Sequence, residues 1–212
     1  TSWRVARGEW TAREGRFIGS GDSRIDFKRE LPREGVLTFK MNVRRGLRPR
    51  IRLTDNLWFG NEGDRRRLAF HATGSLHPNF GHDYANGSEL QIRIVLGPNQ
   101  FRAFVDGTFV GFAARNKDQP LKLSLQGGDG WSQGKTEFYE LAISPLSSDD
   151  ARLPTTEVRY GGRKYLICNV PVSRKKAAAE CKEFGGYLVR VQSPEEYRFV
   201  QGLIREQGST HC

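Results

Sequence analysis

The sequence predicts a mainly β protein: an antiparallel β-sandwich of the jelly-roll kind, followed by a small α+β segment. The first observation is a series of about ten short segments of alternating apolar residues, separated by Gly, Pro and Asn turns. The second is Gln100–Phe112, where Asp106-Gly107 separates two β-prone runs and indicates a tight hairpin, because Gly accepts positive φ. The third is a helical pattern that begins only after Ser144–Thr156, a stretch rich in Ser, Asp and Pro.

The predicted strands follow one another at short intervals along the first two-thirds of the chain. In Val36–Val43 the residues Leu37, Phe39 and Met41 share one face, as expected for a half-buried antiparallel strand. We place the hairpin of Gln100–Phe112 at the centre of one sheet and expect no useful helix before residue 146. Other strands are predicted around a turn at Glu14-Gly15 and at Ile25–Phe27, Arg50–Leu53, Leu68–Ala72, Glu89–Leu96, Leu121–Leu125 and Phe138–Ile143.

The change of pattern divides the chain into two modules. We assign residues 1–146 to the sandwich, 147–156 to a linker and 157–212 to the α+β segment. In this segment we predict strands and helices in alternation, with capping signals at both helix starts. They are a strand at Lys164–Asn169, a helix from Ser173 to Phe184 stopped by Gly185-Gly186, a strand at Tyr187–Val191, and a helix opened by the capping box Ser193-Pro194-Glu195-Glu196.

Composition narrows the class of partner. The chain carries 34 Lys and Arg against 24 Asp and Glu, a net charge of +10. This charge favours anionic partners: acidic or sulfated glycans, nucleic acid or a membrane surface. Solvated surface charges are the alternative reading. No apolar run approaches the roughly 18 residues of a membrane span, and no signal peptide is visible. Since the chain begins at Thr1, we expect it to be a fragment or a processed chain.

Three cysteines, Cys168, Cys181 and Cys212, lie in the last quarter of the chain. They are too few for a disulfide scaffold, and their odd number leaves at least one without an internal partner. Their spacing is not that of a zinc motif. The redox compartment is therefore left open.

A set of residues between Tyr160 and Ile204 has a characteristic order and spacing: Tyr165, Ala177, Cys181, Gly185-Gly186-Tyr187-Leu188, Ser193, Glu196, Phe199 and Val200. With these residues the segment resembles the first half of a C-type lectin-like domain. The tryptophan usual near the start of the first helix is absent, since Ser173 or Arg174 stands there. The resemblance implies that the calcium and sugar ligands lie in the missing half. It also implies that Cys181 lacks its usual partner.

Three features of the first module form a second pattern: the opening Trp3…Gly8-Glu9-Trp10…Glu14-Gly15, the Asp106-Gly107 hairpin, and the closing Phe138-Tyr139-Glu140-Leu141. This pattern resembles the concanavalin A-like lectin/glucanase sandwich, in its laminin-G-like or 3-keto-disaccharide-hydrolase-like branches. The resemblance implies two packed sheets. Because that sandwich carries lectins, adhesion modules and glycosidases, the fold does not fix the function.

Arginines and aromatic residues supply the candidate ligand-binding residues. Alternation places Arg48, Arg50 and Arg52 on one strand face, about 6.6 Å apart, where guanidiniums could bind sulfate or carboxylate groups. A solvated face paired with acidic neighbours is the alternative. Trp58 and Trp131 lie beside glycines in predicted loops, either as exposed platforms for sugar rings or as plugs at the edge of the core. Further arginines nearby are Arg44, Arg45, Arg65, Arg66 and Arg67.

The residues give little support for a metal site or for catalysis. His71, His77, His82 and Asp83 share one stretch, but their spacing fits no metal motif, and we expect no cofactor. The Glu-x-Asp-x-x-Glu strand of sandwich glucanases is absent. Glu137 and Glu140 are three residues apart, which on a regular strand places them on opposite faces. We therefore assign no catalytic residue.

The sequence favours a non-catalytic module that recognises a carbohydrate or a surface ligand, with anionic polysaccharide as the candidate ligand. A glycoside-acting hydrolase of the same fold and a structural protein-interaction module are the alternatives. Nucleic acid is not expected as a partner. The lectin-type modules favour an extracellular, cell-surface or periplasmic location.

Overall fold

The computed structural model describes residues 2–43, 48–61, 67–72, 81–98, 100–115, 119–128, 134–151, 156–167, 173–183 and 185–206. The chain forms two compact units, Thr1–Ser147 and Ser148–Cys212.

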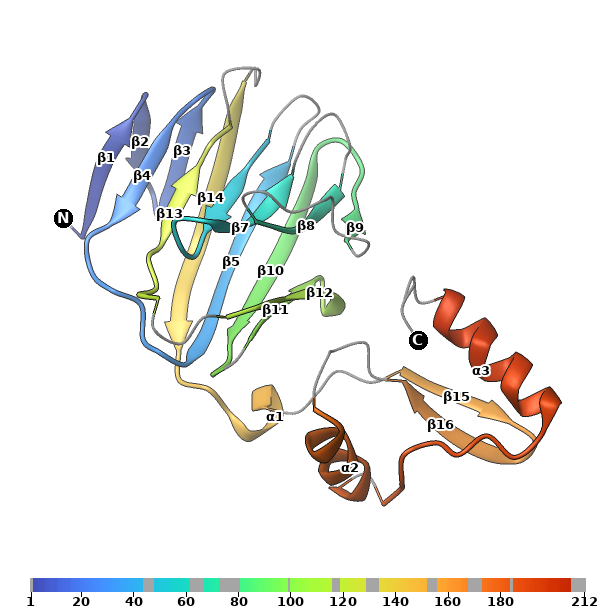
Figure 1. The fold of residues 1–212 in the computed structure, drawn as a ribbon. Helices are drawn as coiled ribbons and strands as arrows, with labels where there is room; N and C mark the ends of the chain where they lie inside the picture. Colours follow the sequence, from blue (N-terminus) through green and yellow to red (C-terminus); the bar gives the residue numbers. More distant parts are fainter. Residues whose placement is uncertain are drawn as a thin grey trace. The chain divides into compact units, whose positions relative to one another are not determined.

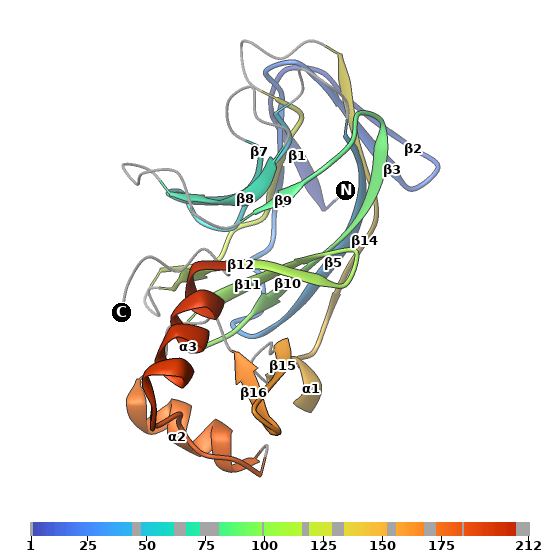
Figure 2. The same ribbon diagram turned by 90° about the vertical axis from the view of Figure 1, so that its right-hand side faces the viewer.

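The first unit is a β-sandwich, as predicted, and the described residues form two seven-stranded antiparallel sheets (Figures 1 and 2). Sheet A has the order β1 (Trp3–Arg7), β4 (Arg24–Phe27), β13 (Ser124–Gln126), β6 (Arg50–Arg52), β7 (Leu57–Asn61), β8 (Arg67–Ala72) and β9 (His82–Asp83). Sheet B has the order β12 (Thr108–Ala114), β11 (Gln100–Val105), β10 (Ser88–Leu96), β5 (Gly35–Val43), β14 (Lys135–Ser144), β3 (Arg16–Ser20) and β2 (Trp10–Arg13).

The core lies between the two sheets and follows from the alternation in the sequence. On β5 the side chains of Leu37, Phe39 and Met41 are buried, as the pattern predicts. The two sheets meet through aromatic contacts, such as Phe70 of sheet A with Phe101 of sheet B, whose ring centroids are 6.5 Å apart. One buried row crosses five neighbouring strands of sheet A in register, from β4 to β8: Ile25, Leu125, Ile51, Phe59 and Phe70. Because side chains alternate along a strand, the flanking residues of these strands point outward.

The Asp106-Gly107 hairpin forms between β11 and β12 as predicted. Both residues have positive φ, 49° and 78°, and the Asp106 carboxylate accepts a hydrogen bond of 2.9 Å from the Gln91 backbone N–H. The prediction that this hairpin is central in its sheet is wrong, because β12 is the edge strand and β5 lies between β10 and β14. The Asp-Gly signal concerns only the residues of the turn. It does not indicate which strands lie next to the two strands of the hairpin.

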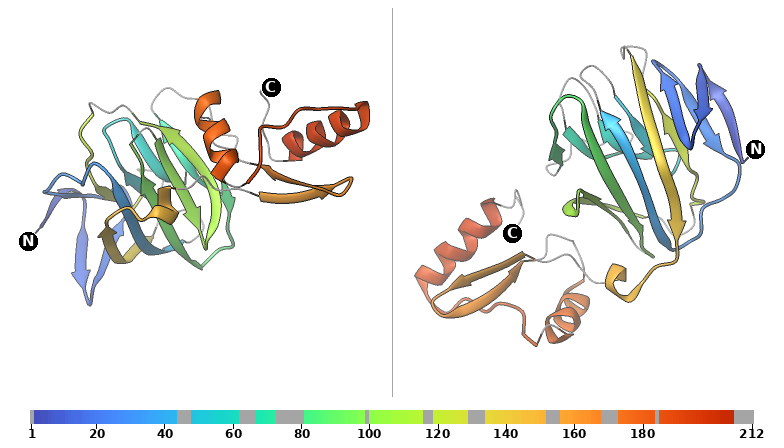
Figure 3. Two further views of the ribbon diagram at one scale, coloured as in Figure 1. Left: turned by 90° about the horizontal axis from the view of Figure 1, so that it is seen from below. Right: turned by 180° about the vertical axis from the view of Figure 1, so that it is seen from behind.

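The second unit combines a β-hairpin with helices. Strands β15 (Thr156–Tyr160) and β16 (Arg163–Ile167) pair antiparallel, and helix α3 (Pro194–Glu206) runs alongside them (Figure 3). Phe199 of α3 stacks on Tyr160 and meets Tyr165 edge-on, with centroid distances of 4.2 and 5.2 Å. The other helices are α1 (Ser148–Ala151) and α2 (Arg174–Glu183).

Both predicted helix caps of this unit are present. Ser193 Oγ accepts the Glu196 N–H at 3.1 Å, and the Glu196 carboxylate accepts the Gln192 N–H at 2.6 Å. Ser173 caps α2 in the same way, through a 3.3 Å bond from the Lys176 N–H. The strand predicted at Tyr187–Val191 is wrong: these residues have no strand pairing, and alternation alone cannot supply the partner that a strand needs.

Candidate functional site

A row of polar and aromatic side chains crosses the outer face of sheet A. Its members pair in register from strand to strand, and the buried row of the same strands lies one residue away on the opposite face. Neighbouring members are separated by about one strand spacing, roughly 4.8 Å. The row consists of Arg4, Asp26, Ser124, Arg52, Trp58 and His71.

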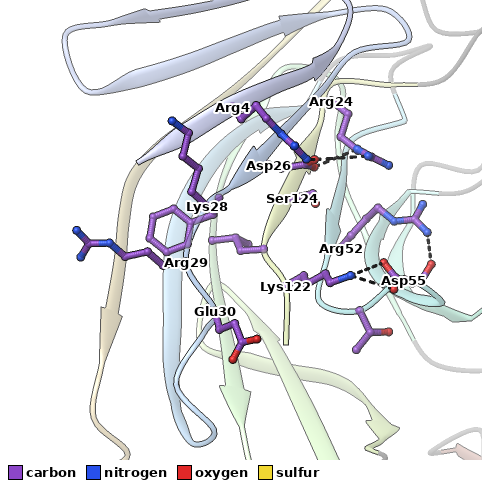
Figure 4. Close-up of a pocket in the computed structure, with 13 residues that line it drawn as sticks. Arg4, Arg24, Asp26, Lys28, Arg29, Glu30, Arg52, Asp55, Lys122 and Ser124 are labelled. Carbon is purple, nitrogen blue, oxygen red and sulfur yellow. Dashed lines mark hydrogen bonds and ion pairs between the residues drawn. The ribbon is translucent and has the colours of Figure 1, made fainter. Parts of the chain in front are cut away.

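Part of this row lines an open groove of about 650 Å³ (Figure 4). The groove is formed by β1, β4, β13 and β6, by the segments that follow β4 and β6, and by the segment that precedes β13. Cationic side chains outnumber carboxylates around it, six to three. The cations are Arg4, Arg24, Lys28, Arg29, Arg52 and Lys122, and the carboxylates are Asp26, Glu30 and Asp55.

Two of the carboxylates hold cations in ion pairs. Asp26 lies between two arginines, with Arg24 Nε 3.0 Å from Oδ1 and Arg4 Nη2 3.3 Å from Oδ2. On the other side of the groove, Lys122 Nζ lies 3.2 and 3.4 Å from the two oxygens of Asp55. Because two arginines share the single carboxylate of Asp26, this cluster keeps a positive charge. Lys28, Arg29 and Arg52 supply the rest of the positive excess of the groove.

Arg52 occupies that central position. Its guanidinium donates to the backbone carbonyl oxygen of Asp55, a neutral acceptor. Burial, and then the nearby charges of Arg24 and Arg50, lower the pKa of Arg52, and these effects outweigh the opposing influence of Asp55 and Asp26. Arg52 is therefore a partly desolvated cation with two further arginines near it, and an anion that binds it would offset part of this burial and repulsion.

Trp58 lies in strand β7 and not in a loop, which corrects the sequence-based expectation. On the β8 side its ring stacks on His71, at 5.9 Å between centroids and 16° between planes. On the β6 side the guanidinium carbons of Arg50 and Arg52 lie 5.6 and 5.3 Å from the ring centroid. Trp58 is half-exposed, and its contacts on the two neighbouring strands make it a support for the arginines.

The predicted ligand-binding residues are only partly brought together. Arg50, Arg52 and Trp58 are neighbours on the outer face of sheet A. Arg48 precedes β6, is half-buried, and does not line the groove. Trp131 lies outside the described residues, as do His77, Arg44, Arg45, Arg65 and Arg66.

Sequence reasoning missed most of the groove. Arg4, Arg24, Asp26 and Lys122 were not singled out as ligand-binding candidates, although Arg24 and Asp26 flank the inward Ile25 on β4. The sequence signal for these groove residues was the alternation of polar and apolar residues on three separate strands. Which of these strands are neighbours depends on long-range pairing, which the pattern does not encode.

The outer face of sheet B carries two carboxylates that were expected on opposite faces. A β-bulge between Tyr139 and Ala142, with Glu140 at a φ of 52°, breaks the alternation. Glu137 bonds Arg16 at 3.0 Å and Glu140 bonds Lys40 at 2.9 Å, so both carboxylates lie on the outer face, contrary to the prediction. Between them, burial and then the nearby Glu89 carboxylate raise the pKa of Tyr139 to about 12.

In the described part of the chain, no three His, Cys, Asp or Glu side chains gather as a set of metal ligands. His82 and Asp83 lie in β9, and His71 lies in β8, where it stacks on Trp58. None of the described helices has the length and apolar character needed to cross a membrane.

No protein-family model and no curated protein matches the sequence. Solved structures that resemble this chain include carbohydrate-binding modules and glycosyl hydrolases with the same β-sandwich fold. Carbohydrate-binding module CBM66 from Bacillus subtilis matches with a TM-score of 0.53 and 12% identity, over 68% of this chain and 96% of that one. A putative glycosyl hydrolase from Parabacteroides distasonis matches with a TM-score of 0.51 and 14% identity, over 69% of this chain and 100% of that one.

The Bacteroides ovatus xyloglucan PUL GH43B protein gives a TM-score of 0.52 at 12% identity, over 68% of this chain and 37% of that one. At such identities these likenesses establish the fold alone.

Proposed function

We propose that the first unit is a non-catalytic module that recognises an anionic polysaccharide through the groove on the outer face of sheet A. The observation that carries this proposal is the excess of cations over carboxylates around Arg52. The fold, shared with a carbohydrate-binding module and with putative glycan-active enzymes, supports a carbohydrate as the ligand.

The chemistry of the groove suits carboxylate or sulfate groups. A guanidinium is planar and binds such groups through two parallel hydrogen bonds. Arg52 is held against Trp58, which lowers the entropy lost when it binds a ligand. Ser124 lies beside Arg52 in the same row and adds a hydroxyl for the hydroxyl groups of a sugar.

The two-module organisation belongs to the same proposal. Residues 1–146 form the concanavalin-like recognition module, 147–156 the linker, and 157–212 part of a C-type lectin-like module. Such a combination suits a protein that works at a cell surface, in the periplasm or outside the cell.

A glycoside hydrolase is the second candidate, and the β-bulge of β14 favours it. The bulge brings Glu137 and Glu140 to one face of sheet B, and glycosidases need two carboxylates on either side of a bond. Each carboxylate is, however, already bound to a cation, Arg16 or Lys40. Because both carboxylates are already held in ion pairs, we rank the recognition module first.

Binding measurements with the 212-residue chain test the proposal. Polygalacturonate and dextran sulfate serve as anionic polymers, and dextran as the neutral control. We expect Arg52→Ala to weaken binding of an anionic polymer by about tenfold or more, since hydrogen bonds to charged groups contribute about 1.5–3 kcal/mol. Binding should also weaken steeply with salt, because the groove is exposed to solvent.

Arg16→Ala is the matched control for Arg52→Ala. Arg16 also contacts an aromatic ring, Tyr139 at 4.3 Å, and makes one ion pair, but it lies on sheet B. It should leave the affinity for the anionic polymer nearly unchanged. Equal losses in both variants, or equal binding of dextran and polygalacturonate, would rule out the groove as the recognition site.

A further inference from the structure

Two carboxylates of the groove form ion pairs with cations that an anionic ligand would also need to bind. From this arrangement we infer that Asp26 and Asp55 act as built-in competitors, which restrict the groove to polymers with several closely spaced anionic groups. The inference rests on the proposed function and specifies its ligand class: polyanionic glycans such as chains of uronic acids, and not single acidic sugars.

Asp26 is the more strongly held competitor. Its side chain is only 18% exposed and lies between Arg24 and Arg4. Figure 4 shows both arginines directed toward Asp26. An incoming anion that takes either arginine leaves the other to neutralise Asp26. A ligand can therefore take one arginine from Asp26 at small cost, but taking both would leave the carboxylate without an ion-pair partner.

Asp55 is the weaker competitor, at the other side of the groove. Its side chain is 72% exposed and its partner Lys122 is 55% exposed. Exposed pairs of this kind contribute little to stability, so a ligand can exchange with Asp55 at small cost. Lys122 is thus a cation that a ligand can recruit, but only in competition with a carboxylate that is always present.

Arg52 lies between these two ion-paired clusters, one strand away from Ser124. Because its hydrogen bond goes to a carbonyl oxygen, its charge is not neutralised by a directly bonded carboxylate. A single anion can bind Arg52 without displacing anything, but gains only one contact. A polymer can bind Arg52 and then compete for Arg24 or Lys122 at the high local concentration that its linkage provides.

Removing a competitor should therefore tighten polymer binding. We expect Asp55→Asn to raise the affinity of the full chain for polygalacturonate by about two- to fivefold, the range that corresponds to an exposed ion pair. Asp26→Asn should act in the same direction. The exposed Asp55 keeps the test valid if the less exposed Asp26 proves necessary for folding.

Glu140→Gln is the matched control, because it makes the same change of net charge and releases Lys40 from its ion pair on sheet B. It should leave the affinity nearly unchanged. Monomeric galacturonic acid, at the same concentration of carboxylates, should bind far more weakly than the polymer to the unmodified chain.

The outcomes separate this inference from the proposed function. If Arg52→Ala abolishes polymer binding but Asp55→Asn binds no more tightly than Glu140→Gln, the groove is the site and the competitor role is wrong. Equal binding of monomer and polymer per carboxylate would overturn the inference in the same way. If the unmodified chain binds no anionic polymer, the proposed function fails, and the inference fails with it.

Discussion

At the scale of single residues, the groove depends on how Trp58 holds two arginines. The ring lies between His71 on one neighbouring strand and Arg50 and Arg52 on the other. Contacts of a cation with an aromatic face contribute about 0.5–1 kcal/mol at exposed sites. Trp58 is therefore a positioning residue for Arg52.

This role makes a prediction about the chemistry of the residue at position 58. Trp58→Phe keeps an aromatic face and should keep most of the affinity for polygalacturonate. Trp58→Leu keeps apolar bulk without the π system and should weaken binding by about two- to fivefold. Thermal unfolding of both variants checks that they are similarly stable. A purely structural role for Trp58 would give equal affinities in two equally stable variants.

Glu140 shows why sequence alternation assigned one pair of residues to the wrong faces. The period of two holds only while every residue stays in the ladder, and a bulge adds one residue that shifts all that follow. Glu140 adopts a φ of 52°, which is uncommon for a residue other than glycine. No turn residue or glycine at that position announces the bulge in the sequence.

At the scale of elements, helix α3 is joined to its hairpin through one carboxylate. Glu196 is buried and accepts hydrogen bonds from the Tyr165 hydroxyl and the Gln192 N–H, both at 2.6 Å. These two bonds, with the Tyr165 bond first, lower the pKa of Glu196. Tyr165 lies on β16, so the helix cap and the hairpin contact are one network.

The lowered pKa predicts how this network responds to acid. Its stabilisation is fully present above the ordinary glutamate pKa and is lost as the pH falls through the lowered value. Urea unfolding followed by helical circular dichroism, between about pH 6 and about pH 3, measures this loss. Glu196→Gln should be less stable at the higher pH and should lack the acid-induced change.

Glu195→Gln is the matched control for Glu196→Gln. Glu195 lies in the same helical turn, but its carboxylate is exposed and makes a long ion pair of 3.8 Å with Arg198. It should retain the acid-induced loss of stability. If Glu195→Gln and Glu196→Gln show the same pH dependence, the network around Glu196 does not control the stability of α3.

Turns and helix caps were predictable because they depend on residues that are neighbours in the sequence. The turns at Glu14-Gly15 and Asp106-Gly107 both adopt positive φ, because their hairpins need it. The Ser193 cap formed for the same reason. Tyr187–Val191 has the alternation of a strand but no pairing, since a ladder depends on a partner elsewhere in the chain.

At the scale of the whole first unit, the sandwich was predictable because each strand has one apolar face. Sheets built from such strands bury these faces by packing against each other. The groove was not predictable, because it needs the register of strands that are far apart in the chain. Strand β13 lies between β4 and β6, which places Ser124 between Asp26 and Arg52. Only that order turns scattered cations into one surface.

Mapping the binding surface tests the central claim most directly. Amide chemical shifts of the full chain are recorded while an oligogalacturonate is added. We predict changes concentrated on β4, β6 and β13, around Asp26, Arg52 and Ser124. Changes confined to the outer face of sheet B or to the second unit, or no changes at all, would contradict the claim that the groove of sheet A recognises anionic polysaccharide.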